Sequence, residues 1–169
     1  MISPGDPAWQ AFLDAANDYI ELIDRSSARN DVDTLAEVHR SLLELQLAAL
    51  DLPETTTDGD DPAMVTEAKR ADHAKLKDVF DVRYVMSEQV LVIPVRSGTA
   101  EIRELSEDLA EIYDSLQDIR ALNEQRYTDD AASQARAGYI EDWGYLVVSA
   151  QAALWKCIAE AAIDAEEST

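Results

Sequence analysis

Cysteine is almost absent from this sequence, because Cys157 is the only one in 169 residues. A single cysteine excludes an internal disulfide and a zinc site built from several cysteines. Glycine and proline are also scarce, at five residues each, which is too few for the many turns of a loop-rich β-sandwich. The sequence shows no signal peptide and no run near the ~20 apolar residues of a membrane-spanning helix. We therefore expect a cytoplasmic protein that does not enter a membrane.

Basic residues are also scarce in this sequence. Lysine and arginine number 14 against 35 aspartates and glutamates, so the net charge is −21. Such a chain repels nucleic-acid phosphates and anionic membrane surfaces, which argues against direct binding to either. The same charge can attract basic protein surfaces or divalent metal ions, or it can simply keep the protein soluble. Composition alone leaves these alternatives open.

The sequence is rich in apolar residues, at 47%, and they recur at steps of three and four. This spacing is typical of amphipathic helices. The apolar stripes start at Trp9, Leu35, Ile102 and Tyr139, and Asp6 with Pro7 predicts the start of the first helix. A second apolar row, Leu43, Leu47 and Leu50, suggests that its helix is central and contacts neighbours on both sides. The sequence therefore predicts an all-α fold, with residues 1–169 in one mostly antiparallel bundle of five to six helices.

Two connections interrupt the helical pattern. Residues 54–62 form an acidic loop, and an EF-hand reading fails because Lys69 stands where a bidentate glutamate belongs. Asp61 and Pro62 are expected to start a third helix that ends near Val79. Residues 80–98 are expected to form an irregular connection, and the β-branched run from Val90 to Val95 has no evident partner strand, so no sheet is inferred.

The stretch IEDWGYLVVSAQAALWKC, residues 140–157, is expected to lie within one last helix that Thr128 caps. Trp143 lies on its apolar stripe, whereas Trp155 lies one step off it, at the edge of the core or in a contact. Gly144 is expected to let a neighbouring helix approach closely. Cys157 is expected to be a buried and unreactive thiol, because it has apolar helical neighbours and no histidine nearby in the sequence.

Four short phrases carry a family resemblance. They are LAALDLPE (47–54), DVFD (78–81), LSEDLAEIYDSLQD (105–118) and EDWGYLVVSAQAAL (141–154). Together they resemble an uncharacterised bacterial family, the domain of unknown function 5063. The resemblance implies an all-helical fold and no agreed activity. The family usually has a histidine before its Trp-Gly pair, and Asp142 stands there in this sequence, so no role for that imidazole carries over.

The most distinctive pattern is an acidic edge beside the stripe that begins at Ile102. We call this edge the acid ridge: Glu101, Glu104, Asp108, Glu111, Ser115 and Asp118. The opposite edge of the same helix carries no acid. The partner-binding candidates are Glu104, Glu107, Asp108, Glu111 and Asp114. The leading hypothesis is an acidic interaction module, an adaptor or inhibitor-like protein, that binds a basic partner protein at this ridge.

An enzyme is the alternative hypothesis. Acidic pairs resemble the magnesium-holding motifs of all-helical nucleotide pyrophosphohydrolases, namely Glu21-x-x-Asp24, Glu104-x-x-Glu107 and Glu111-x-x-Asp114. A third possibility is a homodimer formed through the second apolar row.

Other catalytic patterns are missing from the sequence. A di-iron bundle needs Glu-x-x-His pairs, but Ala36 and Arg70 stand three residues before His39 and His73. Both histidines are expected at the surface or the edge of the core. No nucleophile elbow or phosphate-binding glycine loop occurs. We predict no catalytic residue, metal ligand or cofactor, and expect a binding protein rather than an enzyme.

Overall fold

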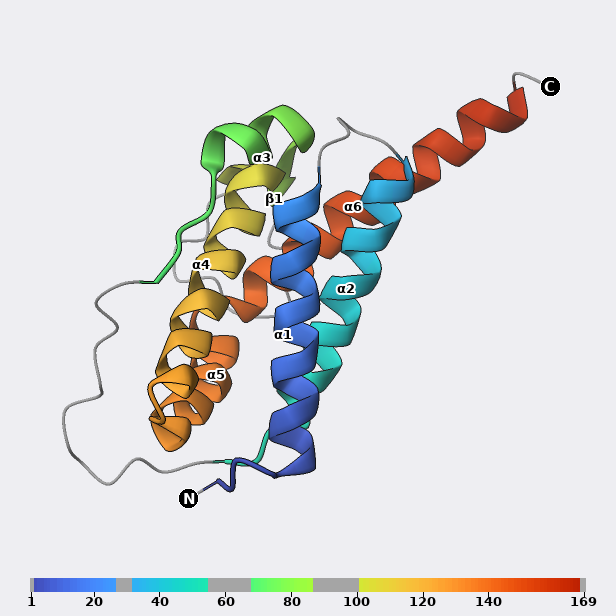
Figure 1. The fold of residues 1–169 in the computed structure, drawn as a ribbon. Helices are drawn as coiled ribbons and strands as arrows, with labels where there is room; N and C mark the ends of the chain where they lie inside the picture. The colour runs from blue at the N-terminus through green and yellow to red at the C-terminus, as the bar shows by residue number, and fades with distance from the viewer. Residues whose placement is uncertain (1, 27–31, 55–67, 87–100, 168–169) are drawn as a thin grey trace.

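The computed structural model describes residues 2–26, 32–54, 68–86 and 101–167. Within these residues the chain forms six helices and one pair of strands (Figure 1). In chain order they are α1 (Pro7–Arg25), α2 (Val32–Leu50), α3 (His73–Val79), β1 (Arg83–Met86), β2 (Glu101–Glu104), α4 (Leu105–Glu124), α5 (Thr128–Glu141) and α6 (Gly144–Glu167). The predicted all-α class and the expected number of helices are confirmed.

Helix α1 begins and ends as its sequence predicts. The Asp6 carboxylate accepts hydrogen bonds from the backbone N–H groups of Ala8, at 3.0 Å, and Trp9, at 3.2 Å. These bonds satisfy donors that the first turn of any helix leaves free, and Pro7 needs none. Ser26 follows the last turn, and its N–H bonds to the Leu22 carbonyl.

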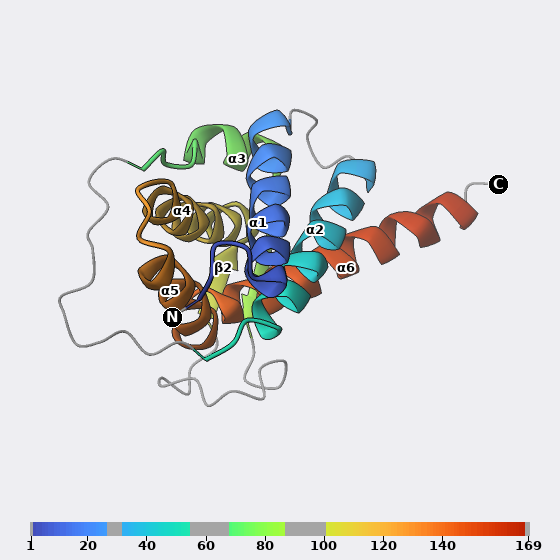
Figure 2. The same ribbon diagram turned by 60° about the horizontal axis from the view of Figure 1, so that its bottom comes forward.

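Four long helices enclose the core. Helices α1 and α6 each contact both α2 and α4. Figure 2 shows α1 crossing in front of the gap between α2 and α4. An aromatic chain fills one end of the interior, because the ring centroids of Trp9 and Phe12 lie 5.6 Å apart and those of Phe12 and Trp143 lie 6.4 Å apart. The burial of Trp143, which is 1% exposed, agrees with its place on the predicted stripe.

The strand pair differs from the sequence expectation. Strands β1 and β2 pair antiparallel, with Arg83 opposite Glu104 and Met86 opposite Glu101. The sequence pattern predicts that residues 101–104 begin a helix, but that helix, α4, starts only at Leu105. The Leu105 N–H still bonds to the Val82 carbonyl at 2.9 Å, so pairing with a distant segment decides the backbone here. The run Val90 to Val95 lies outside the described residues.

The predicted third helix is shorter than expected. Residues 68–72 are not helical, and α3 starts at His73 with Asp72 as its N-cap, accepting from the Lys75 N–H at 3.0 Å. The reason is a competing contact, since the Ala71 N–H donates to the Asp114 carboxylate on α4 at 2.7 Å. The end at Val79 is confirmed, while Asp61, Pro62 and most of the 54–62 loop lie outside the described residues.

The predicted single last helix is two helices, and the chain turns at Asp142 and Trp143. The Gly138 carbonyl accepts the N–H groups of both Asp142, at 2.9 Å, and Trp143, at 2.8 Å. A Cβ atom on Gly144 would lie 1.9 Å from the Tyr139 carbonyl oxygen. Gly144 therefore permits this turn, in which the end of α5 closely approaches the start of α6. Thr128 is the first residue of α5 rather than its cap.

Helix α6 is partly core and partly projecting. Its first half packs against α2 and α4, and its second half extends beyond the bundle (Figures 1 and 2). Trp155 and Ile163 are 65% and 56% exposed. The stretch Gly144–Ala165 is long and apolar enough to cross a membrane, with a mean hydropathy of 1.4, which the sequence analysis did not expect. Of the hydropathy window, 39% is buried, which is the part of α6 that packs in the core.

Candidate functional site

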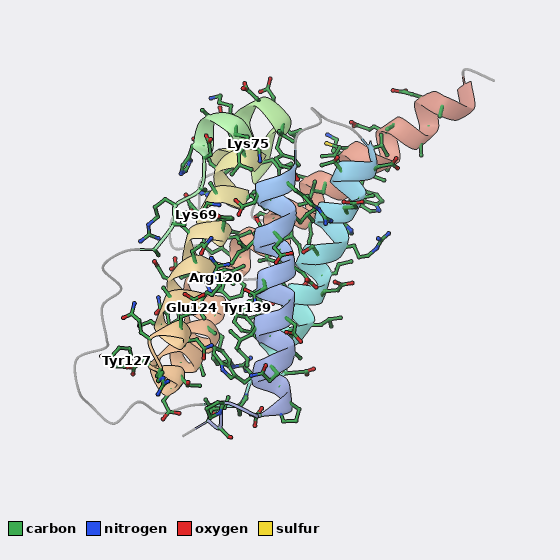
Figure 3. The ribbon with its side chains drawn as sticks, viewed as in Figure 1. Lys69, Lys75, Arg120, Glu124, Tyr127 and Tyr139 are labelled. Carbon is green, nitrogen blue, oxygen red and sulfur yellow. The ribbon has the colours of Figure 1, made fainter. Side chains whose placement is uncertain are left out.

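Most of the acid ridge lies on α4, but several of its carboxylates form ion pairs with lysines and arginines of the same chain. Glu104 pairs with Lys77 at 3.0 Å, and Asp118 pairs with Arg70 at 3.0 Å. The next residue, Ala71, donates its backbone N–H to Asp114 of α4. Residues 69–77 therefore run along this edge, and we call this segment the strap. Figure 3 shows Lys69 and Lys75 beside α4 and α1. The ridge is therefore not a continuous exposed acidic surface.

The strap also binds the end of α1. Lys69 Nζ lies 2.7 Å from the Asp24 carboxylate, and the Tyr113 hydroxyl donates to the same carboxylate at 3.0 Å. Lys75 donates to the Asp24 backbone carbonyl. Because these groups are already paired within the chain, Asp24 is poorly placed to serve as a metal ligand. Among the partner-binding candidates, Glu107 and Glu111 are exposed, and their partner-binding role stays a prediction.

Asp108 lies in the interior, which corrects its expected place on an exposed edge. Its side chain is 0% exposed, and both Nε and Nη2 of Arg103 lie 2.6 Å from its Oδ1. Burial raises the pKa of Asp108 to about 8, and the charge of Glu111 adds to the rise. The Arg103 guanidinium acts in the opposite direction, because it favours the carboxylate. Asp108 is thus an internal polar residue rather than a docking residue.

The acidic pairs that suggested a pyrophosphohydrolase do not converge. Within the described part of the chain, no three Asp, Glu, His or Cys side chains come close enough together to hold a metal ion. Glu111 lies 3.6 Å from Arg103, and Glu104 is paired with Lys77. His39 is half-buried, and burial lowers its pKa, whereas His73 is exposed. The geometry of these residues gives the enzyme hypothesis no support.

Cys157 is expected to react slowly with thiol reagents. Its side chain is half-buried, and burial together with the nearby Glu160 charge raises the pKa of the thiol. Since the thiolate is the reactive form, its alkylation by iodoacetamide at about pH 7.5 should be several-fold slower than that of an unfolded control peptide. Mass spectrometry of timed samples measures this rate. A rate equal to that of the peptide would contradict the expectation.

The outer side of α2 carries a row of exposed leucines. Leu43, Leu47 and Leu50 are 41%, 64% and 52% exposed, and they recur at steps of four and three, so they share one face. We call these three residues the outer α2 face. Helix α2 has neighbours on two sides, as its two apolar rows predict, because it contacts both α1 and α6. Among the described residues, however, no neighbour buries this second row. The other row of α2, which includes Leu42 and Leu45, faces the core.

The two borders of the outer α2 face differ in chemistry. On one border, Gln46 accepts a hydrogen bond from Gln151 of α6 at 3.1 Å, and the exposed Trp155 lies one turn beyond Gln151. The other border lies roughly 80–120° around the helix axis from the leucine row, and it is acidic. Its exposed acids are Asp33, Glu37, Glu44 and Asp51, and Arg40 is the one lysine or arginine in α2. The face is therefore apolar, with an acidic margin.

Comparison with known proteins identifies the fold but no activity. A family model described as a domain of unknown function (DUF5063) matches residues 5–160. Among solved structures, protein BF1032 from Bacteroides fragilis matches with a TM-score of 0.68 at 19% sequence identity, covering 88% of this chain and 90% of that one. At that identity the likeness shows a shared fold alone. A comparison with curated proteins finds no significant match.

Proposed function

This chain belongs to the DUF5063 family, and we propose that it is a protein-interaction module whose outer α2 face binds a basic amphipathic helix of a partner protein. The observation that carries the proposal is the row Leu43, Leu47 and Leu50, each at least 41% exposed. Single exposed apolar residues are normal, but a contiguous row along one helix marks an interaction surface. An amphipathic helix that lays its apolar side on such a row is a common form of recognition.

The acidic margin supports a basic partner. Glu37, Glu44 and Asp51 lie along the edge of the face, and the whole chain carries a net charge of −21. A helix with leucines on one side and lysines beside them would match both features. Complementary charge would accelerate its association and make binding weaker at high salt. A second copy of this chain is a poorer match, because two molecules of the same high negative charge repel each other.

The energy available at this face is sufficient for specific binding. Complete burial of one leucine side chain contributes about 1.5–3 kcal/mol. Since each leucine is already partly covered, the gain per residue is lower, but three leucines act together. Trp155 is 65% exposed on α6, one turn beyond the residue that bonds to Gln46 of α2, so it can add a large flat contact.

The proposal predicts that the double substitution Leu43→Ser and Leu47→Ser weakens peptide binding at least tenfold, a loss of about 1.4 kcal/mol. The probe is a synthetic helix of leucine and lysine, with fluorescence anisotropy as the measurement at low and high salt. Ile140→Ser is the matched control, because Ile140 is 61% exposed on a different helix, α5. It should bind the peptide as the unsubstituted protein does.

Three outcomes would contradict the proposal. The first is equal binding of a leucine–glutamate peptide, and the second is an equal loss in the Ile140→Ser control. The third is a monomer–dimer equilibrium that the double substitution abolishes, since it would assign the face to a second copy. Analytical ultracentrifugation at about 0.15 M and 1 M salt measures that equilibrium.

A further inference from the structure

A groove of about 270 Å³ lies between α1 and α2, and its lining includes Glu37 and Glu44 of the acidic margin. Its walls carry Asp18 and Glu21 from α1 and Glu37 and Glu44 from α2. These four acids stand at the rim, and the buried part of the lining is formed by Leu22 and Ser41, which are 5% and 8% exposed.

Ser41 is the unusual member of this lining. Its hydroxyl oxygen is buried, and it has no hydrogen-bond partner among the residues that the structure describes. A buried hydroxyl without a partner is costly, and a serine in a helix ordinarily bonds to the carbonyl four residues earlier. Ser26, at the end of α1, does so with Leu22 at 2.7 Å. Ser41 therefore offers a free acceptor where α1 and α2 meet.

The charges in the groove favour an organic cation. Two arginines, Arg25 and Arg40, also line it, and Arg25 pairs weakly with Glu37 at 3.5 Å. Four carboxylates against two guanidinium groups leave a net charge of −2. In the described part of the chain, which includes the groove, no three acidic side chains lie close enough together to hold a metal ion. A cation with separated charges suits this spread of acids better than a compact one.

We propose that this groove binds a small alkyl diamine. The apolar chain of such a ligand would lie on Leu22, one ammonium group would donate to the Ser41 hydroxyl, and the rim carboxylates would pair with both ends. A volume of about 270 Å³ is ample for a four-carbon diamine. The site shares Glu37 and Glu44 with the acidic margin of the outer α2 face, but Asp18, Glu21, Leu22 and Ser41 belong to the groove alone.

The test uses the full chain and 1,4-diaminobutane at about 0.15 M salt, with amide shifts in NMR and calorimetry as readouts. We expect saturable binding with the largest shifts at Leu22 and Ser41. Ser41→Ala and Glu21→Gln should each weaken binding by about tenfold. Glu107→Gln removes one exposed charge on α4 and is the matched control, for which less than a twofold change is expected.

A purely structural role for Ser41 gives a different result. Removal of an unpaired buried hydroxyl should leave the protein at least as stable, so a loss of diamine binding without a loss of stability indicates contact with the ligand. Butylamine carries only one charge, and Mg²⁺ carries both of its charges on one small ion. Both should bind more weakly than the diamine. Non-saturable binding, equal binding of Mg²⁺, or an equal effect of Glu107→Gln would overturn the proposal. Neither Ser41→Ala nor Glu21→Gln alters the three leucines of the outer α2 face or the shared acids Glu37 and Glu44, so the two proposals can fail separately.

Discussion

Replacing Gly144 with alanine is expected to lower the free energy of unfolding by about 3 kcal/mol or more. The added Cβ atom would lie 1.9 Å from the Tyr139 carbonyl oxygen and 2.9 Å from the carbonyl carbon. Both are backbone atoms at the end of α5, so the clash is relieved only if α5 and α6 move apart. That movement would disturb Trp143, which is 1% exposed in the core. Urea unfolding followed by circular dichroism measures the loss.

Gly5→Ala is the matched control for this substitution. A Cβ atom on Gly5 would meet nothing within 4 Å, so its stability should change by less than about 0.5 kcal/mol. Equal stability of the Gly144→Ala and Gly5→Ala proteins would show that the turn between α5 and α6 adapts at little cost. In that case the glycine would not be required for the turn.

Local signals in the sequence were sufficient for much of the helical fold. Asp6 and Pro7 mark the start of α1 because capping involves only neighbouring residues. The apolar stripes of α1 and α2 follow from the helical period alone, and Phe12 and Leu42 are buried as those stripes require. A family resemblance over most of the chain agreed with this result, and the match over residues 5–160 confirms it.

Contacts between distant segments explain the errors in the fold. Strand β2 forms because residues 83–86 lie beside it, and its own sequence, EIRE, continues the helical stripe equally well. The shortened α3 depends on the contact between Ala71 and Asp114, which are 43 positions apart. The turn at Asp142 depends on how Trp143 packs against Gly138. A single sequence does not reveal these pairings.

The candidate sites also divide into features that local sequence patterns predict and features that depend on contacts between distant segments. The sequence identified two apolar rows on α2, but periodicity cannot tell which row the core will cover, and Leu47 proved to be exposed. It also placed Asp108 at an edge, because this residue lies one step off the apolar stripe. Its burial requires a partner, since charged residues are rarely buried without one. The partner, Arg103, lies in the strand that precedes the helix. The groove beside Ser41 depends on the approach of α1 to α2 and has no sequence signal.

Asp108 gives the protein a specific dependence of stability on pH. Burial raises the pKa of its carboxyl in the folded state to about 8, from an ordinary value of 3.8. As the pH rises above about 4, the unfolded chain loses this proton first, whereas the folded protein keeps it. The unfolded state is then increasingly favoured, so stability falls as the pH rises through this interval. Above a pH of about 8 the folded state also ionises, and the decline from this group ends.

The substitution Asp108→Asn is therefore expected to flatten the pH dependence. Asparagine resembles the protonated acid in shape and does not ionise, and its side-chain carbonyl can still accept a hydrogen bond from Arg103. Between about pH 5 and 7, the unsubstituted protein should lose stability relative to the variant by up to about 1.4 kcal/mol per pH unit. Urea unfolding at several pH values measures the difference.

The control for this prediction is Glu107→Gln, which removes an exposed acid one residue earlier and should leave the slope unchanged. A different outcome for Asp108→Asn would be an equal loss of stability at every pH above about 5. The carboxylate would then be ionised and held by Arg103 throughout this range, against the raised pKa that burial produces. In that case the two residues act as a buried ion pair, whose disruption typically costs about 3–5 kcal/mol.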